Sequence, residues 1–224
     1  MIVTAPPPTQ SSEAGGPFVK VDGRESLLRS VELFLNRENV KQIQLVIDPE
    51  DLDEAKRKYG THLGLMGAKL TAGGPKWNDQ VAAAGKHIVA EATHVILHDA
   101  ARPAVPYTDI EALMECAAQN AAVMLTAPVR AQLVELDEGC NPVAFHVPTN
   151  FLQLLTPQAF SKEKFAQLAS GKEIHASEAK LVKGSPLNVR VGSSADERVT
   201  KAMLNMLPKP KVKAPSSPFE EAQW

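Results

Sequence analysis

Short apolar runs alternate with helical patterns along most of this chain. Residues 42–47 (QIQLVI) form such a run, and it is bounded by Asp48 and Pro49. This pair suits a helix start, because aspartate caps the first turn and proline is tolerated at its first position. Further strands are predicted at 94–98, 121–129 and 187–191. Strands that alternate with helices indicate right-handed β-α-β units and a mostly parallel central sheet.

Helical segments fill the intervals between these strands. We expect the helix after Pro49 to cover residues 51–60 and to end on Gly60, because glycine commonly follows the last helical residue. The other predicted helices lie near 26–36, 77–90, 107–120 and 196–207. One region departs from this alternation: LVELD (133–137) and PVAFHV (142–147) are joined by a short turn and predict a hairpin arm.

The two ends of the chain differ from its centre. PPPTQSSEAGGP (6–17) and the segment 208–224 are rich in proline, serine and glycine and offer little apolar surface to bury. We therefore expect one domain over residues 1–207, with a mobile loop at 6–17 and a β-arm at 131–148, followed by a disordered tail. A chain of 224 residues is long enough for one sizeable core.

Composition narrows the classes of partner. With 24 Lys and Arg against 26 Asp and Glu, the chain has no overall basic footprint for nucleic acid. No segment approaches the roughly 18 consecutive apolar residues that a membrane-spanning helix needs. The first ten residues resemble no export signal, so a cytoplasmic protein is expected. Its two cysteines lack metal-binding spacing.

The stretch THVILHDAARP (93–103) carries the clearest candidate chemistry. Its apolar run ends in His98, Asp99 and Arg102, and ligands of open parallel sheets bind beyond the carboxyl ends of the strands. Asp99 can hold a divalent cation or a ribose hydroxyl, Ala100 leaves space for a ligand, and Arg102 can pair with a phosphate. Alternatively, Asp99 and Arg102 form a local ion pair or cap the next helix. His98 is expected to pack or to support its neighbours.

Several motifs occur in an order that resembles the 2-C-methyl-D-erythritol 4-phosphate cytidylyltransferase family. They are HDAARP (98–103), TPQAF (156–160), APVR (127–130) and AGG (72–74), and the resemblance covers roughly residues 18–207. It implies an α/β fold, a nucleotidyltransferase-type (Rossmann-like) three-layer sandwich with a mostly parallel central sheet and a small β-arm used in dimerisation. It also implies that CTP is joined to a sugar-alcohol phosphate with Mg²⁺ and that pyrophosphate is released, a step of isoprenoid precursor synthesis.

The same resemblance implies roles for individual residues. Arg198 and Lys20 would be the catalytic cations, and Asp99 would also hold Mg²⁺. Contacts with the nucleotide and the sugar phosphate would come from Gly73, Gly74, Asp99, Ala100, Arg102 and Arg130.

The chain also departs from the family pattern. The family surrounds the triphosphate with a glycine-rich loop that carries Arg and Lys, whereas the segment from Thr4 to Val19 contains neither, and Thr149 stands where an acceptor-binding arginine is expected. Two hypotheses therefore stay open. In one, Lys20, Lys76, Arg130 and Arg198 form a rearranged phosphate cradle in an active transferase. In the other, the protein is a catalytically inactive relative that binds a nucleotide or a partner.

A third hypothesis, a nicotinamide-dependent oxidoreductase, is least favoured. No GxGxxG motif follows any predicted strand, and the AGG of residues 72–74 is weak evidence alone.

Overall fold

The computed structural model describes residues 2–5 and 16–207. Most of the predicted mobile loop (6–15) and the whole predicted tail (208–224) lie outside the described residues. The last two loop residues, Gly16 and Pro17, are buried in the short 3-10 helix η1 (Gly16–Phe18).

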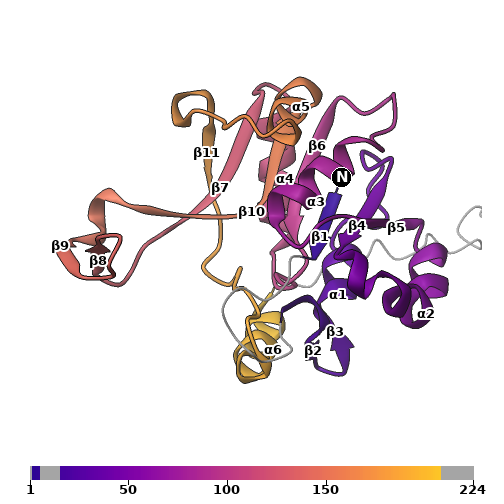
Figure 1. Ribbon diagram of the computed structural model, residues 1–224, viewed down its shortest axis with the longest axis horizontal. Helices are drawn as coiled ribbons and strands as arrows, with labels where there is room; N and C mark the ends of the chain where they lie inside the picture. The colour runs from indigo at the N-terminus through magenta and orange to yellow at the C-terminus, as the bar shows by residue number, and fades with distance from the viewer. Residues whose placement is uncertain (1, 6–15, 208–224) are drawn as a thin grey trace, which may run out of the picture.

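A seven-stranded sheet forms the centre of the protein (Figure 1). The strand order is β11-β7-β10-β6-β1-β4-β5, and only β10 runs antiparallel to its two neighbours. The mostly parallel sheet predicted from the sequence is therefore confirmed. The strands are β1 (Ile2–Ala5), β4 (Ile43–Ile47), β5 (Ala68–Ala72), β6 (His94–Asp99), β7 (Ala122–Pro128), β10 (Leu152–Ser161) and β11 (Lys180–Lys183).

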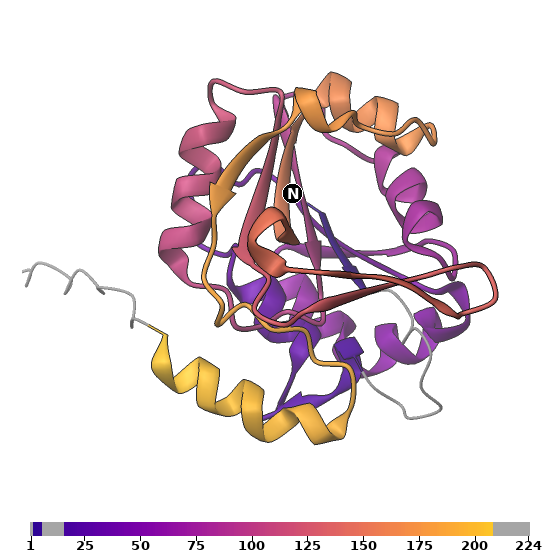
Figure 2. The same cartoon turned by 90° about the vertical axis from the view of Figure 1, so that its left-hand side faces the viewer.

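Helices cover both faces of this sheet, which makes three layers (Figure 2). On one face, α1 (Ser26–Glu32), α2 (Pro49–Leu65) and α4 (Tyr107–Ala117) contribute to the larger core cluster. On the other face, α3 (Trp77–Gly85) and α5 (Lys162–Ala169) pack in the smaller one. Alternate residues of β4 show the division: Leu45 belongs to the first cluster and Val46 to the second.

The helix after β4 begins as predicted but ends later. The Asp48 side chain accepts a hydrogen bond from the Glu50 backbone N–H at 3.0 Å, and Pro49 occupies the first turn. The prediction that this helix ends on Gly60 is wrong, because α2 continues to Leu65. The chain turns at Gly67, whose φ of +70° is readily reached by glycine.

The predicted strand at 187–191 is absent from the described structure. β11 already forms the sheet edge beside β7, and residues 187–191 form an irregular segment that returns toward β6 instead. There the Val191 N–H donates to the Ala101 carbonyl at 2.8 Å. Strands β5, β10 and β11 and helix α5 were not predicted from the sequence either.

Two small hairpins stand outside the sheet. β8 (Leu133–Leu136) and β9 (Pro142–His146) form the predicted β-arm, which extends away from the sheet to the left in Figure 1. β2 (Lys20–Val21) and β3 (Arg24–Glu25) form the other hairpin. The C-terminal helix α6 (Glu197–Met206) packs on this second hairpin, where Lys201 pairs with Asp22 at 2.7 Å.

Candidate functional site

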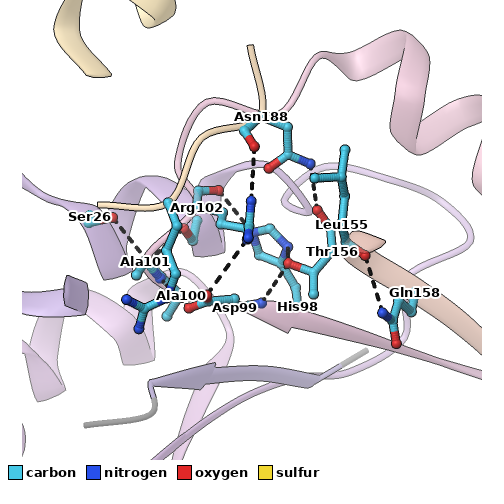
Figure 3. A network of polar contacts seen from close by, with 12 residues as sticks. Ser26, His98, Asp99, Ala100, Ala101, Arg102, Leu155, Thr156, Gln158 and Asn188 are labelled. Carbon is cyan, nitrogen blue, oxygen red and sulfur yellow. Dashed lines mark hydrogen bonds and ion pairs between the residues drawn. The ribbon is translucent and has the colours of Figure 1, made fainter. Parts of the chain in front are cut away.

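The candidate site lies at the carboxyl end of β6, the strand next to β1. Three segments that are distant in sequence meet there: residues 98–102, Thr156 of β10, and residues 188–190 (Figure 3). We call the side chains of His98, Asp99, Arg102, Thr156, Asn188 and Arg190 the Asp99 cluster. Because β10 is antiparallel, its first half lies at the edge where β6 ends.

Asp99 is almost fully enclosed by groups of the chain itself. Its Oδ1 accepts the Ala101 backbone N–H at 2.9 Å, and its Oδ2 accepts the Arg190 Nε–H at 2.8 Å. Arg102 Nε lies 3.7 Å from the same Oδ2, and the carboxylate side chain is only 9% exposed. The local ion pair weighed from the sequence is therefore present.

Arg102 spans the cluster from β6 to the irregular segment before α6. Its Nη1 donates to the Asn188 carbonyl at 2.9 Å, and Asn188 in turn donates from Nδ2 to the Thr156 carbonyl at 2.6 Å. Burial of the guanidinium lowers the pKa of Arg102, while the neighbouring Asp99 charge raises it. These contacts fasten the end of β6 to β10 and to the 188–190 segment.

Arg190 is the functional candidate that sequence reasoning missed. The alternation in LNVRV indicated a strand, which would have placed this arginine on a sheet face and not at the site. One feature of the sequence could have indicated it: Arg190 is the one cation in the short segment LNVRV (187–191), shortly before the last helix. The structure places it against Asp99, with 28% of its side chain exposed.

His98 supports the cluster as a neutral side chain. The Asp99 N–H donates to Thr156 Oγ1 at 3.1 Å, and this hydroxyl lies 3.3 Å from His98 Nδ1. His98 Nε2 lies 3.1 Å from the Arg102 carbonyl, which only accepts, so Nε2 carries the proton and Nδ1 receives the threonine hydrogen. Burial lowers the pKa of His98 to about 4, against the smaller raising effect of Asp99.

Ala100 is fully buried beneath α1. Its carbonyl accepts hydrogen bonds from Ser30 Oγ at 2.9 Å and Ser26 Oγ at 3.1 Å. The space that a small residue was predicted to leave for a ligand is filled here by α1. Packing against this helix therefore accounts for an alanine at this position.

Gly73 and Gly74 follow β5, where the sheet meets α3. A Cβ at Gly73 would lie 2.7 Å from Val46 Cγ1, and one at Gly74 would overlap the Asp79 side chain. The Gly73 N–H donates to the Ile47 carbonyl at 2.8 Å, and Gln80 Nε2 donates to the Gly74 carbonyl at 3.2 Å. Close approach of α3 to the sheet therefore requires glycine at both positions.

The other predicted cations do not join the Asp99 cluster. Lys20 lies on the small hairpin and pairs with Glu25 at 3.7 Å, beside a pocket of about 490 Å³ between that hairpin and α2. Arg130 is exposed after β7, and Arg198 is exposed on α6. Arg190, eight positions before Arg198, is the late cation that reaches Asp99.

Comparison with known proteins shows the family of this chain. Residues 10–206 match the profile of the 2-C-methyl-D-erythritol 4-phosphate cytidylyltransferase family, which is most of the chain. The chain belongs to that family. A relative of this name from Rhodopirellula baltica is 28% identical over 218 residues, covering 87% of this chain and 88% of the relative. One from Escherichia coli K12 is 30% identical over 148 residues, covering 65% and 61% respectively.

Solved structures of family members share the fold. The 4-diphosphocytidyl-2C-methyl-D-erythritol synthase of Anaerococcus prevotii superposes with a TM-score of 0.73 at 19% identity, covering 91% of this chain and 94% of the other. The Thermus thermophilus enzyme gives 0.69 at 20% identity, covering 92% and 98%. The predicted nucleotidyltransferase-type, Rossmann-like sandwich is thereby confirmed.

The metal predicted for this cytidylyltransferase relative does not fit Asp99 as the residues are arranged. A divalent cation at a carboxylate is repelled by other positive groups close to the same oxygens. Oδ2 lies against the guanidinium groups of Arg190 and Arg102, and Oδ1 already accepts a backbone N–H. Within residues 2–5 and 16–207, no three His, Cys, Asp or Glu side chains gather as a metal-binding group.

Proposed function

We propose that this protein is a cytidylyltransferase that transfers the cytidylyl group of CTP to 2-C-methyl-D-erythritol 4-phosphate and releases pyrophosphate. This would be a step in the synthesis of isoprenoid precursors. The observation that carries the proposal is the family match over residues 10–206. The position of the Asp99 cluster at the carboxyl end of β6 supports it, because that edge of an open α/β sheet is where ligands bind.

The reaction requires charge stabilisation more than covalent chemistry. An oxygen of the acceptor phosphate attacks the α-phosphorus of CTP, and the bond from that phosphorus to the pyrophosphate oxygen breaks. Negative charge must be neutralised where the two anions meet. We assign this role to Arg102, which contacts Asp99 and Asn188, and to Arg190, which pairs with Asp99. Gly73 and Gly74 shape the turn after β5, which β1 and β4 separate from β6.

A coupled assay of pyrophosphate release tests the proposal. Purified protein is incubated with CTP and 2-C-methyl-D-erythritol 4-phosphate, and we expect release that requires both substrates. Arg102→Gln should lower kcat/KM roughly 100-fold, as expected for loss of one preorganised charge-stabilising group. Arg57→Gln, which removes an exposed arginine of α2, is the matched control. Absence of turnover with this substrate pair would contradict the proposal.

The second candidate function is a catalytically inactive relative that binds nucleotide or a partner. The observation that favours it is the separation of Lys20, Arg130 and Arg198 from Asp99, since none of them forms an ion pair with that carboxylate. Saturable CTP binding by calorimetry without any pyrophosphate release would support this reading over the first.

We further propose that the β-arm pairs with a second copy of the chain. Its side chains are apolar and exposed in the described structure: Val134, Leu136, Val143, Phe145 and Val147. Contiguous exposed apolar surface of this kind marks interaction sites. The mass of the protein in solution, measured by light scattering, tests the pairing.

We also propose that the protein acts in the cytoplasm. Cys116 and Cys140 are both free thiols, as is usual in a reducing compartment. Within the described residues, no helix combines the length and apolar character needed to cross a membrane. Fractionation of cells that express the full chain with a fluorescent tag tests the location.

A further inference from the structure

The pocket of about 490 Å³ between the β2–β3 hairpin and α2 shares no residue with the Asp99 cluster (Figure 1). Its volume lies in the range of small-molecule sites. One wall comes from the segment between η1 and β3, and the other comes from one face of α2, whose residues recur at helical spacing. The lining residues are Phe18, Lys20, Glu25, Asp51, Glu54, Ala55, Lys58 and Tyr59. The arginines assigned to the proposed transfer reaction are not among them.

Two aromatic side chains make part of this pocket apolar. Phe18 and Tyr59 are partly buried, and both pack against the larger core cluster, to which the buried Ala55 belongs. Burial, followed by the charge of Glu25 and its hydrogen bond, raises the pKa of Tyr59 to about 12, so the phenol is neutral at physiological pH. Aromatic faces that are held in place attract organic cations.

The charges around the pocket do not balance. Glu25 pairs with Lys20 at 3.7 Å, and Glu54 pairs with Lys58. Asp51, the third carboxylate of the lining, forms no ion pair with any of the described residues. Three carboxylates against two ammonium groups leave the lining with a net charge of −1.

Asp51 is the carboxylate that lacks a counter-charge. It is exposed in the first turn of α2, with other acidic side chains around it. Burial, and then the charges of Asp48, Glu54 and Glu50, raise the pKa of Asp51. A bound cation would supply the positive charge that the chain does not place beside this group.

A neighbouring pocket of about 660 Å³ lacks this imbalance, although it shares three lining residues with the first. Two carboxylates line only this second pocket, and the chain supplies a partner for each. Glu32 pairs with Arg24, and Asp22 pairs with Lys201 at 2.7 Å. The unmatched negative charge therefore belongs to the first pocket.

The spacing of the carboxylates favours an organic cation over a metal ion. A divalent cation gathers several oxygen ligands around one point. Within residues 2–5 and 16–207, no three His, Cys, Asp or Glu side chains come together in that way. An alkylammonium ion is larger, so it can contact a carboxylate and an aromatic face at the same time.

We propose that this pocket binds a small organic cation of the alkylammonium class, with its charge beside Asp51 and its alkyl groups against Phe18 and Tyr59. Such binding would join α2 to the segment that carries the β2–β3 hairpin. It does not depend on the proposed function, because neither a nucleotide nor a phosphate takes part.

The test uses choline as the probe, with its uncharged carbon analogue dimethylbutanol as the control. The full chain, isotope-labelled for NMR, is titrated with each compound. We expect saturable shifts with choline, at a Kd in the millimolar range or below, for amides within residues 18–25 and 51–59. Dimethylbutanol should give no saturable shift, and millimolar Mg²⁺ should not displace choline. Failure of choline to bind at these residues, equal binding of dimethylbutanol, or displacement by Mg²⁺ would overturn the inference.

Three variants test the role of charge. Asp51→Asn should weaken choline binding roughly three- to fivefold, the effect of losing a partly exposed ion pair. Glu50→Gln removes the other carboxylate in the first turn of α2, which does not line the pocket, and should change the Kd little. Lys58→Gln removes a like charge from the lining and should tighten binding. Equal weakening by Asp51→Asn and Glu50→Gln, with both variants folded by circular dichroism, would assign the effect to the helix start, and the inference would fail.

The result can be separated from that of the transferase assay. Choline binding at this pocket without pyrophosphate release would support this inference and contradict the proposed function. Pyrophosphate release by a protein that does not bind choline would do the reverse.

Discussion

The Asp99 cluster and the β-arm differ in whether their side chains find partners within the same copy of the chain. In the cluster, charged and polar side chains are enclosed, and the chain supplies partners for the carboxylate, the imidazole and the threonine hydroxyl. In the arm, apolar side chains stand in solvent, and Phe145 is 78% exposed. The cluster is thus explained by contacts within one copy, whereas the arm would be explained by the proposed pairing with a second copy.

Removing the carboxylate at the centre of the cluster should have the largest effect. Asp99→Ala leaves Arg102 and Arg190 without their counter-charge in a mostly buried place, and we expect a loss of about 3–5 kcal/mol in the free energy of unfolding. Urea denaturation followed by circular dichroism measures it. A loss under about 1 kcal/mol would mean that solvent reaches the two arginines and that the cluster is not enclosed.

Acid should weaken the cluster through His98. Its pKa is about 4 in the folded protein and 6.5 in the reference state, so the unfolded chain binds more protons between these pH values. The stability that neutral His98 contributes is therefore complete above pH 6.5 and declines as the pH falls toward 4, by up to about 3 kcal/mol. Urea midpoints of wild type and His98→Gln, measured from pH 4 to 7.5, should converge toward low pH; parallel curves would contradict the assignment.

A smaller effect is expected at the turn between β5 and α3, which β1 and β4 separate from β6. Gly74→Ala places a methyl group against the Asp79 side chain and should cost about 1–3 kcal/mol, as overpacking usually does. Gly64→Ala in α2 is the matched control, since its new Cβ would meet nothing within 4 Å and should stabilise the helix by about 0.5–1 kcal/mol. Equal thermal midpoints for the two variants would show that α3 shifts to accept the methyl group.

The arm should respond least in stability and most in assembly. Phe145→Glu replaces an exposed side chain, so the free energy of unfolding at low protein concentration should change by no more than about 0.5 kcal/mol. The same variant should reduce the mass found by light scattering from two copies to one. Leu65→Glu, on an equally exposed leucine of α2, should leave the mass unchanged. If the wild-type protein already has the mass of a single copy, the proposed pairing of the arm is wrong.

The sequence indicated the parts of the fold that local pattern determines. β4 and β6 were found because buried runs of β-branched residues end at Asp48 and Asp99, and the arm because its two strands flank a short turn. β10 was not predicted from the sequence, because its pairing with β7 shifts register between Leu154 and Gln158. Pro157, which lies in this interval, has no N–H to donate and argues against a strand.

The site was predictable only in part, for a related reason. The motif at 98–102 is contiguous, so its place at a strand end could be inferred from the sequence. Two partners that define its chemistry, Thr156 and Arg190, lie 57 and 91 residues from Asp99 in the sequence, and only the tertiary structure brings them to it. Arg198 was assigned from the family resemblance, whereas Arg190 lay in the predicted strand at 187–191 and was given no role.

The position of β10 in the sheet determines when the sheet can close during synthesis of the chain. It is synthesised late, yet it lies between β6 and β7, and among the described strands it alone joins the group β5-β4-β1-β6 to the pair β7-β11. Until residue 161 has left the ribosome, β6 and β7 both present unpaired backbone edges, which are templates for pairing with other chains. The nascent protein is therefore most exposed to aggregation during synthesis of the arm and of β10, and closing the sheet is a late event in its folding.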